Sequence, residues 1–209
     1  MIERRGNADR KLARLTEANA RLRRRLAEQA SFWRIAHQDA LTELWNRRYA
    51  DDRLTEEMQR AGDDEGYLFS LVVADVDGLK RINDRRGHAA GDRALKWVAR
   101  FLAGALRVDD VCCRIGGDEF LLILPGSGAD ECRDFLKRLR QEWLHESRAH
   151  EHAVAMSLGT ASYPTHGVGV EALCAVADAS MYEDKRRHSP PDARTSGNLA
   201  ASRRREVEP

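Results

Sequence analysis

Apolar and polar positions divide this chain into short apolar runs and longer segments with a helical period. The short runs predict buried strands, and the longer segments, with apolar residues three or four apart, predict helices that cover them. The predicted strands span residues 68–75, 111–115, 120–124 and 153–162, and the predicted helices span 91–106, 129–148 and 169–186. A pair of adjacent strands interrupts the strand–helix alternation, so the pattern predicts an α+β domain with helices over a largely antiparallel sheet.

Residues 9–37 carry a seven-residue repeat ahead of the first predicted strand. Its a positions are Leu12, Asn19, Leu26 and Trp33, and its d positions are Leu15, Leu22, Gln29 and Ala36. A mostly apolar repeat with one Asn at an a position is typical of a parallel two-stranded coiled coil, because paired buried Asn side chains fix register and dimer state. A single amphipathic helix that packs on its own domain is the alternative. A further helix is expected from Thr42 to Met58, followed by a turn at 61–66.

Charge is unevenly distributed along the chain, although the formal net charge is only +1. Residues 1–36 have a net charge of +6, residues 37–185 of −8 and residues 186–209 of +3. The acidic middle argues against a general nucleic-acid binder, which needs a basic face on the folded domain itself. Residues 188–209 are rich in Pro, Ser and Arg and predict a disordered tail.

The chain has no apolar run near the roughly 18 residues that a membrane-spanning helix needs. Its first residues are charged and do not resemble a signal peptide. The cysteines lie in apolar surroundings without CxxC spacing, which predicts reduced core thiols at Cys112, Cys113, Cys132 and Cys174. We therefore expect a cytoplasmic protein with no membrane segment in this chain.

Two neighbouring carboxylates stand between the apolar runs 111–115 and 120–124. They belong to the segment Gly116-Gly117-Asp118-Glu119, which the pattern places at a hairpin tip, where adjacent glycines allow positive φ and close approach of a ligand. Paired carboxylates beside apolar strands are costly unless a cation neutralises them, and a divalent metal ion is the natural candidate. An acidic turn that is merely solvated is the alternative.

A second group of polar residues follows the apolar run 68–75. The run ends in Asp75-Val76-Asp77-Gly78, Lys80 comes soon after, and a glycine-bearing loop at 87–92 opens the next helix. Carboxylates at a strand end, a nearby Lys and such a loop suit a nucleoside triphosphate and its metal ion. If the strands are neighbours, Asp75 meets Asp118 and Glu119, and the cluster can hold one or two Mg²⁺ ions.

These motifs together resemble the GGDEF family of diguanylate cyclases, whose name-giving residues stand at 116–120. The resemblance covers roughly residues 37–187, through motifs at 39–48, 75–92, 116–120, 157–161 and 177–185. Two departures are Glu43, where the family usually has glycine, and 186–190, which lack its Gly-Arg-Asn-like ending. The resemblance implies a nucleotidyl-cyclase or polymerase-palm-like βαββαβ sheet covered by helices. The heptad predicts that a coiled-coil helix at 1–36 precedes this domain.

The family's reaction condenses two GTP into cyclic di-GMP and releases two pyrophosphates, with Mg²⁺ or Mn²⁺ as cofactor. One domain binds one GTP, so two domains must face each other in a homodimer. The resemblance implies metal ligands at Asp75, the carbonyl of Val76, Asp118 and Glu119. It implies catalytic roles for Asp118, Glu119 and Lys80, and substrate contacts from Asn83, His88, Asp92 and Lys185. Asn83 and Asp92 are expected to read guanine, since a carboxylate accepts from its N1–H and N2–H₂ groups.

Arg107 and Asp110 match the family's inhibitory Arg-x-x-Asp motif, at which cyclic di-GMP binds and arrests the enzyme. An Arg fork suits guanine O6/N7 or phosphate, and a carboxylate suits the guanine N–H edge. Arg138 falls where the family supplies a further Arg to the bound product. The alternative function is a catalytically silent domain that binds cyclic di-GMP here and signals through the coiled coil.

Overall fold

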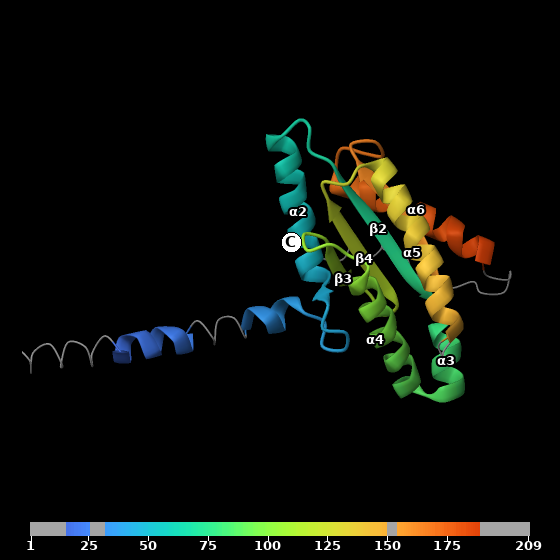
Figure 1. Ribbon diagram of the computed structural model, residues 1–209, viewed down its shortest axis with the longest axis horizontal. Helices are drawn as coiled ribbons and strands as arrows, with labels where there is room; N and C mark the ends of the chain where they lie inside the picture. The colour runs from blue at the N-terminus through green and yellow to red at the C-terminus, as the bar shows by residue number, and fades with distance from the viewer. Residues whose placement is uncertain (1–15, 26–31, 150–153, 189–209) are drawn as a thin grey trace, which may run out of the picture.

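A computed structural model of the chain describes residues 16–25, 32–149 and 154–188 (Figure 1). Its centre is one five-stranded sheet in the order β1-β3-β4-β2-β5. The strands are β1 (Trp45–Asn46), β2 (Phe69–Asp77), β3 (Val111–Arg114), β4 (Glu119–Pro125) and β5 (Ala155–Tyr163). Only the short β1 pairs in parallel, with β3, and the other neighbours are antiparallel. The predicted palm-like βαββαβ arrangement with a largely antiparallel sheet is confirmed.

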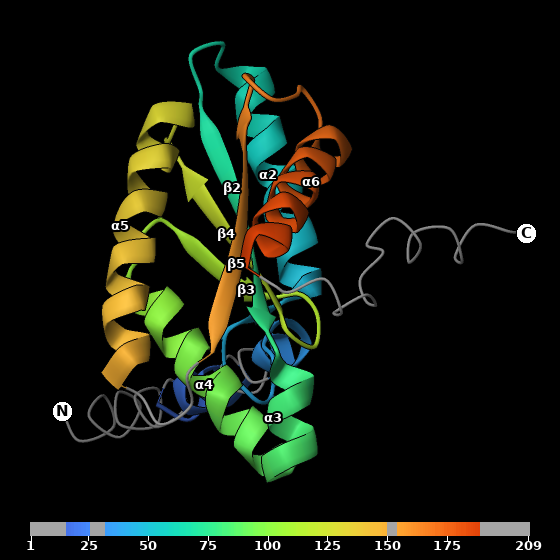
Figure 2. The same ribbon diagram turned by 90° about the vertical axis from the view of Figure 1, so that its right-hand side faces the viewer.

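Helices cover both faces of the sheet, which lies between them in Figure 2. The helices are α2 (Arg47–Asp63), α3 (Leu79–Arg86), α4 (His88–Gly104), α5 (Ala129–Ala149) and α6 (Val170–His188). Alternate β2 side chains point to opposite faces: Val72 joins a core with α4 and α5, while Val73 joins one with α2 and α6. Every β2 residue is buried, because the strand is internal and covered on both sides. This burial explains its continuous apolar run.

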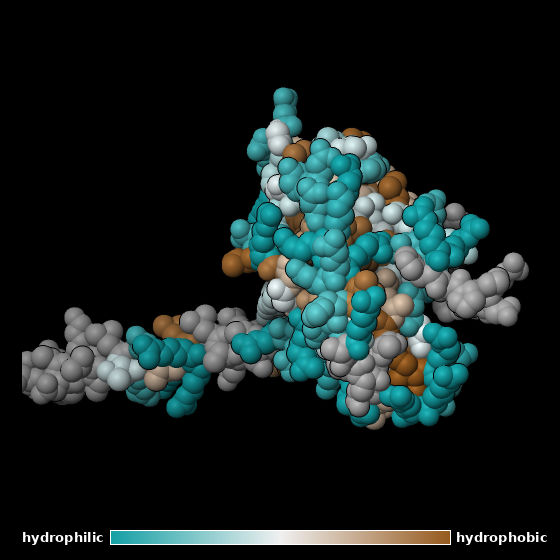
Figure 3. All heavy atoms as spheres, turned by 45° about the vertical axis from the view of Figure 1, so that its right-hand side comes forward, coloured by the Kyte–Doolittle hydropathy of each residue, from teal (hydrophilic) through white to brown (hydrophobic). Residues whose placement is uncertain are grey.

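Figure 3 shows hydrophobic residues only as separate patches among hydrophilic ones on the face that it draws. The predicted free cysteines are confirmed, and three of the four are buried. Burial raises the pKa of the Cys112 and Cys113 thiols, so both stay protonated and serve as small apolar core residues.

Two local predictions from the sequence are wrong. The helix expected from Thr42 begins instead at Arg47, because the Asn46 side chain accepts the Tyr49 N–H and caps the helix there. The residues ahead of it form a turn, in which the Asp39 carboxylate accepts both the N–H and the hydroxyl of Thr42. The loop expected at 87–92 is absent because α4 already begins at His88, and the short helix α3 precedes it between Gly78 and Gly87, both with positive φ.

The N-terminal segment is helical at residues 16–25 and 32–37. Of the predicted heptad positions, Leu12, Leu15, Leu26 and Gln29 lie outside the described residues, as does the predicted tail from 189 onward. Trp33 contacts its own domain, with ring centroids 5.3 Å from Trp45 and 6.0 Å from Tyr49. The Asn46 amide donates to the Ala36 carbonyl at 2.8 Å. The last heptad is therefore held against its own domain, and the coiled coil stays a prediction for the residues before it.

Glu43 stands at the position where the family usually has glycine, and its φ of 62° lies in the left-handed region. A side chain there costs about 1 kcal/mol, and Glu43 is exposed, so no packing offsets the cost. Glu43→Gly should therefore raise the free energy of unfolding by about 0.5–1 kcal/mol, measured by urea titration. Glu43→Ala removes the charge but keeps Cβ, and it should raise the free energy of unfolding much less than Glu43→Gly does. Equal gains from the two variants would contradict the backbone explanation.

Candidate active site

The pairing of β2 with β4 brings together the carboxylates that the sequence singled out. Asp75 and Glu119 are register partners, and the Val76 N–H donates to the Asp118 carbonyl at 2.9 Å. Asp75 is 5% exposed, while Asp118 and Glu119 are partly buried. The two strands are therefore neighbours, which is the condition under which the sequence places Asp75 beside Asp118 and Glu119.

The Gly-Gly turn differs from expectation, because neither Gly116 nor Gly117 has a positive φ. Gly116 is needed for close approach: a Cβ there would lie 2.5 Å from Oε2 of Glu119 and 3.2 Å from its Cβ. The Ile115 and Gly116 N–H groups both donate to the Glu119 carbonyl, at 2.9 and 3.3 Å. The glycine therefore lets the turn fold tightly over Glu119.

Residues far away in the sequence hold this turn in place. The Arg114 guanidinium donates to the Asp39 carboxylate at 3.0 Å and to the Gly117 carbonyl at 2.8 Å. Arg47 Nε donates to the Ile115 carbonyl at 2.8 Å. Burial alone would raise the pKa of Asp39, but hydrogen bonds from Thr42 and Arg114 outweigh it and lower that pKa. The ion pair between Asp39 and Arg114 therefore links the N-terminal segment to the acidic turn.

Negative charge accumulates where β2 and β4 meet. Burial raises the pKa of Asp75, and the nearby carboxylates of Asp118 and Asp77 raise it further, against the opposing effect of Lys185. Burial likewise raises the pKa of Glu119, with Asp118 and Asp75 adding to the shift. Such a site favours a bound cation, because a cation relieves both desolvation and mutual repulsion.

Lys185 of α6 supplies a cation to this site. Its Nζ donates to Asp75 Oδ1 at 2.6 Å and lies 3.8 Å from Asp77 Oδ1. Burial would lower the pKa of Lys185, but the hydrogen bond and charge of Asp75 outweigh it, so that pKa is raised. Asp77 is a buried strand residue that accepts the Ser157 hydroxyl at 2.7 Å. Lys185, predicted to contact the substrate, here contacts a predicted metal ligand.

The donor chemistry at this end of β2 and β4 fits Mg²⁺ or Mn²⁺, which take carboxylate and carbonyl oxygens. The oxygens in question belong to Asp75, Asp118, Glu119 and the Val76 carbonyl. Within the described ranges, no three Asp, Glu, His or Cys side chains are grouped closely enough to hold a metal ion as they stand. Lys185 takes the Asp75 oxygen in this arrangement, so a metal ion there would require side-chain movement.

The predicted nucleotide contacts lie on the helical hairpin formed by α3 and α4. Lys80 is exposed on α3, and His88 and Asp92 are exposed at the start of α4. Asn83 Oδ1 is buried and has no hydrogen-bond partner. A Cβ on Gly91 would overlap that oxygen, so the glycine makes room for the Asn83 side chain. The hairpin thus holds a buried polar atom whose hydrogen-bonding capacity is not met by the described residues.

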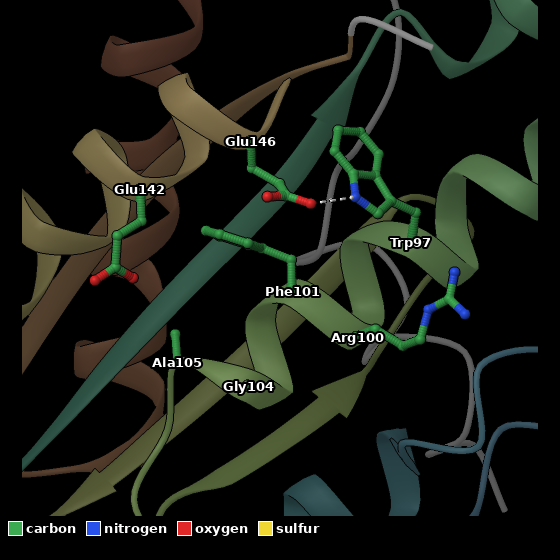
Figure 4. A pocket seen from close by; sticks show the side chains of 7 residues that line it. All are labelled: Trp97, Arg100, Phe101, Gly104, Ala105, Glu142 and Glu146. Atoms are coloured by element: carbon green, nitrogen blue, oxygen red, sulfur yellow. Dashed lines mark hydrogen bonds between the residues drawn. The ribbon is translucent and has the colours of Figure 1, made fainter. Parts of the chain in front are cut away.

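The predicted inhibitory residues lie away from the acidic turn. The Arg107 N–H donates to the Asp110 carboxylate at 2.9 Å in the connection between α4 and β3. Arg138 on α5 has its Nε 3.8 Å from the Glu142 carboxylate. Beside these residues, α4 and α5 enclose a hollow of about 520 Å³, drawn in Figure 4. Its lining residues are Trp97, Arg100, Phe101, Gly104, Ala105, Glu142 and Glu146.

Comparison with known families decides the identity of this domain. The sequence model described as "Diguanylate cyclase, GGDEF domain" matches residues 36–190, most of the chain. The chain belongs to the GGDEF family. TpbB of Pseudomonas aeruginosa, named a diguanylate cyclase, is 38% identical over 177 residues, which are 83% of this chain and 39% of TpbB. The chain thus spans about two fifths of that relative's length.

Solved GGDEF structures share the fold. The coiled coil and GGDEF domain of DgcB from Caulobacter crescentus, in complex with c-di-GMP, matches with a TM-score of 0.73 and 28% identity, covering 84% of this chain and 94% of that one. Diguanylate cyclase SiaD of P. aeruginosa, in complex with its activator SiaC, matches with a TM-score of 0.69 and 30% identity. The match covers 89% of this chain and 72% of the SiaD chain. Across the described part of the GGDEF chain, no helix has the length and apolar character to span a bilayer.

Proposed function

We propose that this GGDEF domain is an active diguanylate cyclase that condenses two GTP into cyclic di-GMP. The observation that carries the proposal is the register pairing of Asp75 with Glu119 next to Asp118, which gathers negative charge where a metal-bound triphosphate is expected. In each of two steps a ribose 3′-oxygen forms a bond to the α-phosphorus of the other GTP, and pyrophosphate leaves with the electron pair of the broken bond. Two hydroxyl protons are released in all.

Residues of this chain have defined proposed roles in that reaction. Asp75, the Val76 carbonyl, Asp118 and Glu119 would hold Mg²⁺ or Mn²⁺, which supplies charge neutralisation at the phosphates when bound. Asp118 accepts the proton of the attacking hydroxyl, and Lys80 stabilises charge on the phosphates. Asn83 and Asp92 bind guanine, for which the unsatisfied Asn83 side chain is an argument once it turns toward the ligand, and His88 lies near the sugar.

Two facing domains are required, since each holds one GTP and contributes one hydroxyl. We propose that residues before Trp33 supply this homodimer through a coiled coil. The described N-terminal helix supports this, because its d-position residue Leu22 is 59% exposed in the single chain. A partner helix would bury that side chain. We further propose that the domain acts in the cytoplasm, where GTP is available.

Incubating the protein with GTP and Mg²⁺, followed by mass analysis of the nucleotides, tests the proposal. The expected product is cyclic di-GMP with two pyrophosphates per molecule formed. Binding of cyclic di-GMP without any turnover would instead support the silent signalling module. If the protein neither forms cyclic di-GMP nor binds it, both functions are overturned.

We propose that cyclic di-GMP inhibits the enzyme at Arg107 and Asp110, with Arg138 as a further contact. These residues adjoin the α4–α5 hollow: Ala105 lines it two positions before Arg107, and Glu142 lines it while pairing with Arg138. An Arg and a carboxylate in the same connection suit a guanine base.

Arg107→Ala should leave the initial rate unchanged and remove product inhibition, raising the inhibitory concentration of cyclic di-GMP at least roughly tenfold. Progress curves with added product measure the effect. Arg133→Ala, an exposed Arg on the outer part of α5, is the matched control and should remain inhibited. Equal slowing of wild type and Arg107→Ala would contradict this site.

A further inference from the structure

Lys185 occupies a critical position in the described structure, because its ammonium contacts the carboxylate that the proposed metal site needs most. The Nζ–Oδ1 distance to Asp75 is 2.6 Å, and a second carboxylate oxygen, Asp77 Oδ1, lies 3.8 Å away. Both acids are only 8% exposed at their side chains, whereas Lys185 is 28% exposed. The ammonium therefore reaches two buried carboxylates from the solvent side.

A lysine and a divalent cation compete for such an oxygen. Both need the same lone pairs of Asp75, and two positive charges at one carboxylate repel each other strongly in a partly buried site. Asp77 Oδ1 also has no hydrogen-bond partner, so the nearby ammonium is its principal source of positive potential. Removing Lys185 from this position without a replacement cation would leave two buried charges uncompensated.

The backbone around Lys185 is anchored, so only its side chain needs to move. The neighbouring Asp184 accepts the Leu158 N–H of β5 at 2.9 Å and pairs with Arg140 of α5 at 2.9 Å. These contacts fix this turn of α6 against β5 and α5. A four-carbon stem that is partly exposed can swing its ammonium outward while the helix stays in place.

We propose that Lys185 is an internal counter-ion that blocks the Asp75 site against free divalent cations and leaves it when a nucleotide triphosphate offers its ammonium a phosphate. The inference rests on the proposed function for the identity of the nucleotide. Its consequence is a coupling: metal ion alone binds weakly, nucleotide releases Lys185, and the two then bind together more tightly. Lys185 is thus a positioning residue that prevents the carboxylates from holding an unproductive metal ion.

Titration of the whole chain with Mn²⁺ tests this coupling without turnover. The electron paramagnetic resonance signal of free Mn²⁺ reports how much of the ion is bound. In wild type, a non-hydrolysable GTP analogue should tighten Mn²⁺ binding at least roughly tenfold. Lys185→Met keeps most of the length of the side chain but removes its charge. In this variant Mn²⁺ alone should bind at least roughly tenfold tighter than in wild type, and the analogue should add little beyond its own metal-binding phosphates.

The matched control is Lys137→Met, which removes an exposed lysine on α5 paired with Asp134, and it should behave as wild type. Lys185→Gln is a second variant in case the Met side chain disturbs folding, which thermal unfolding followed by circular dichroism would reveal. Unchanged or weaker Mn²⁺ binding by folded Lys185→Met and Lys185→Gln overturns the counter-ion role alone. Failure of wild type to bind Mn²⁺ even with the analogue overturns the metal-dependent function as well.

Discussion

Asp75→Asn, or Asp118 and Glu119 both replaced by Ala, should lower GTP condensation at least about a hundredfold while the fold survives. The expected loss is large because these carboxylates are the proposed ligands of the metal ion, and Asp118 is also the proposed proton acceptor. Liquid chromatography of cyclic di-GMP formed per unit time measures the loss. Asp134→Asn, an acid 77% exposed on α5, is the control and should keep full activity.

Stability provides an independent readout for the same variants. The pKa of Asp75 and of Glu119 is raised in the folded state, mainly by burial and further by neighbouring acids. A raised pKa means that folding disfavours the ionised form of each acid. Each acid therefore stabilises the fold when it is protonated, and this stabilisation is lost as pH rises through its folded pKa. Neutral replacements should therefore leave the melting temperature near that of wild type at neutral pH without metal. More than a few per cent of wild-type turnover in either variant would contradict the assignment.

The sequence predicted the meeting of Asp75 with Glu119 because that contact follows from strand pairing. A continuous apolar run predicts an internal strand, and a hairpin brings its acidic turn to a neighbouring strand end. The Lys185–Asp75 ion pair joins residues 110 positions apart and depends on how α6 crosses the sheet. No local pattern carries that information, so the lysine was expected at the substrate instead.

Other misjudged features have similar physical causes. Helix α3 contains only eight residues between two glycines with positive φ, and its polar sequence looks like a loop. Gly116 was expected to supply a positive φ, whereas its role is to avoid overlap with Glu119, which requires the folded turn to be seen. The Arg114 contact with Asp39 links two recognised motifs, but their spacing of 75 residues gives no sign of it.

The contacts of Trp33 change where dimer contacts are expected. A strict heptad puts Trp33 on the seam, yet its ring lies against Trp45 and Tyr49 of its own domain. The seam is therefore expected to end before this residue, while Trp33 and the Asn46–Ala36 hydrogen bond attach the helix to the domain. Through Asp39 and Arg114, the same region contacts the acidic turn, so in the proposed dimer the helices before Trp33 would set the spacing of the two active sites.

Leu22→Glu should therefore convert the protein toward monomer and make its activity steeply dependent on concentration. Losing two buried Leu side chains per dimer costs roughly 3–6 kcal/mol, which corresponds to a roughly 10²- to 10⁴-fold weaker dimer. When dimer is scarce, the rate should approach second order in protein, because two GTP-loaded domains must meet for each turnover. Sedimentation across a dilution series gives the dimer affinity, and cyclic di-GMP formation at the same concentrations gives the activity.

Ala20→Glu is the matched control, because it introduces the same charged residue on the same helix at a b position that faces away from the predicted seam. It should keep the dimer and the wild-type dilution profile, while nucleotide binding per domain should be the same in all three proteins. The pairing of the two measurements matters: a weaker dimer with undiminished specific activity would show that catalysis does not need this seam. A wild-type chain that is monomeric and equally active at every dilution would contradict the coiled-coil dimer itself, since the half-sites would then be meeting by another route.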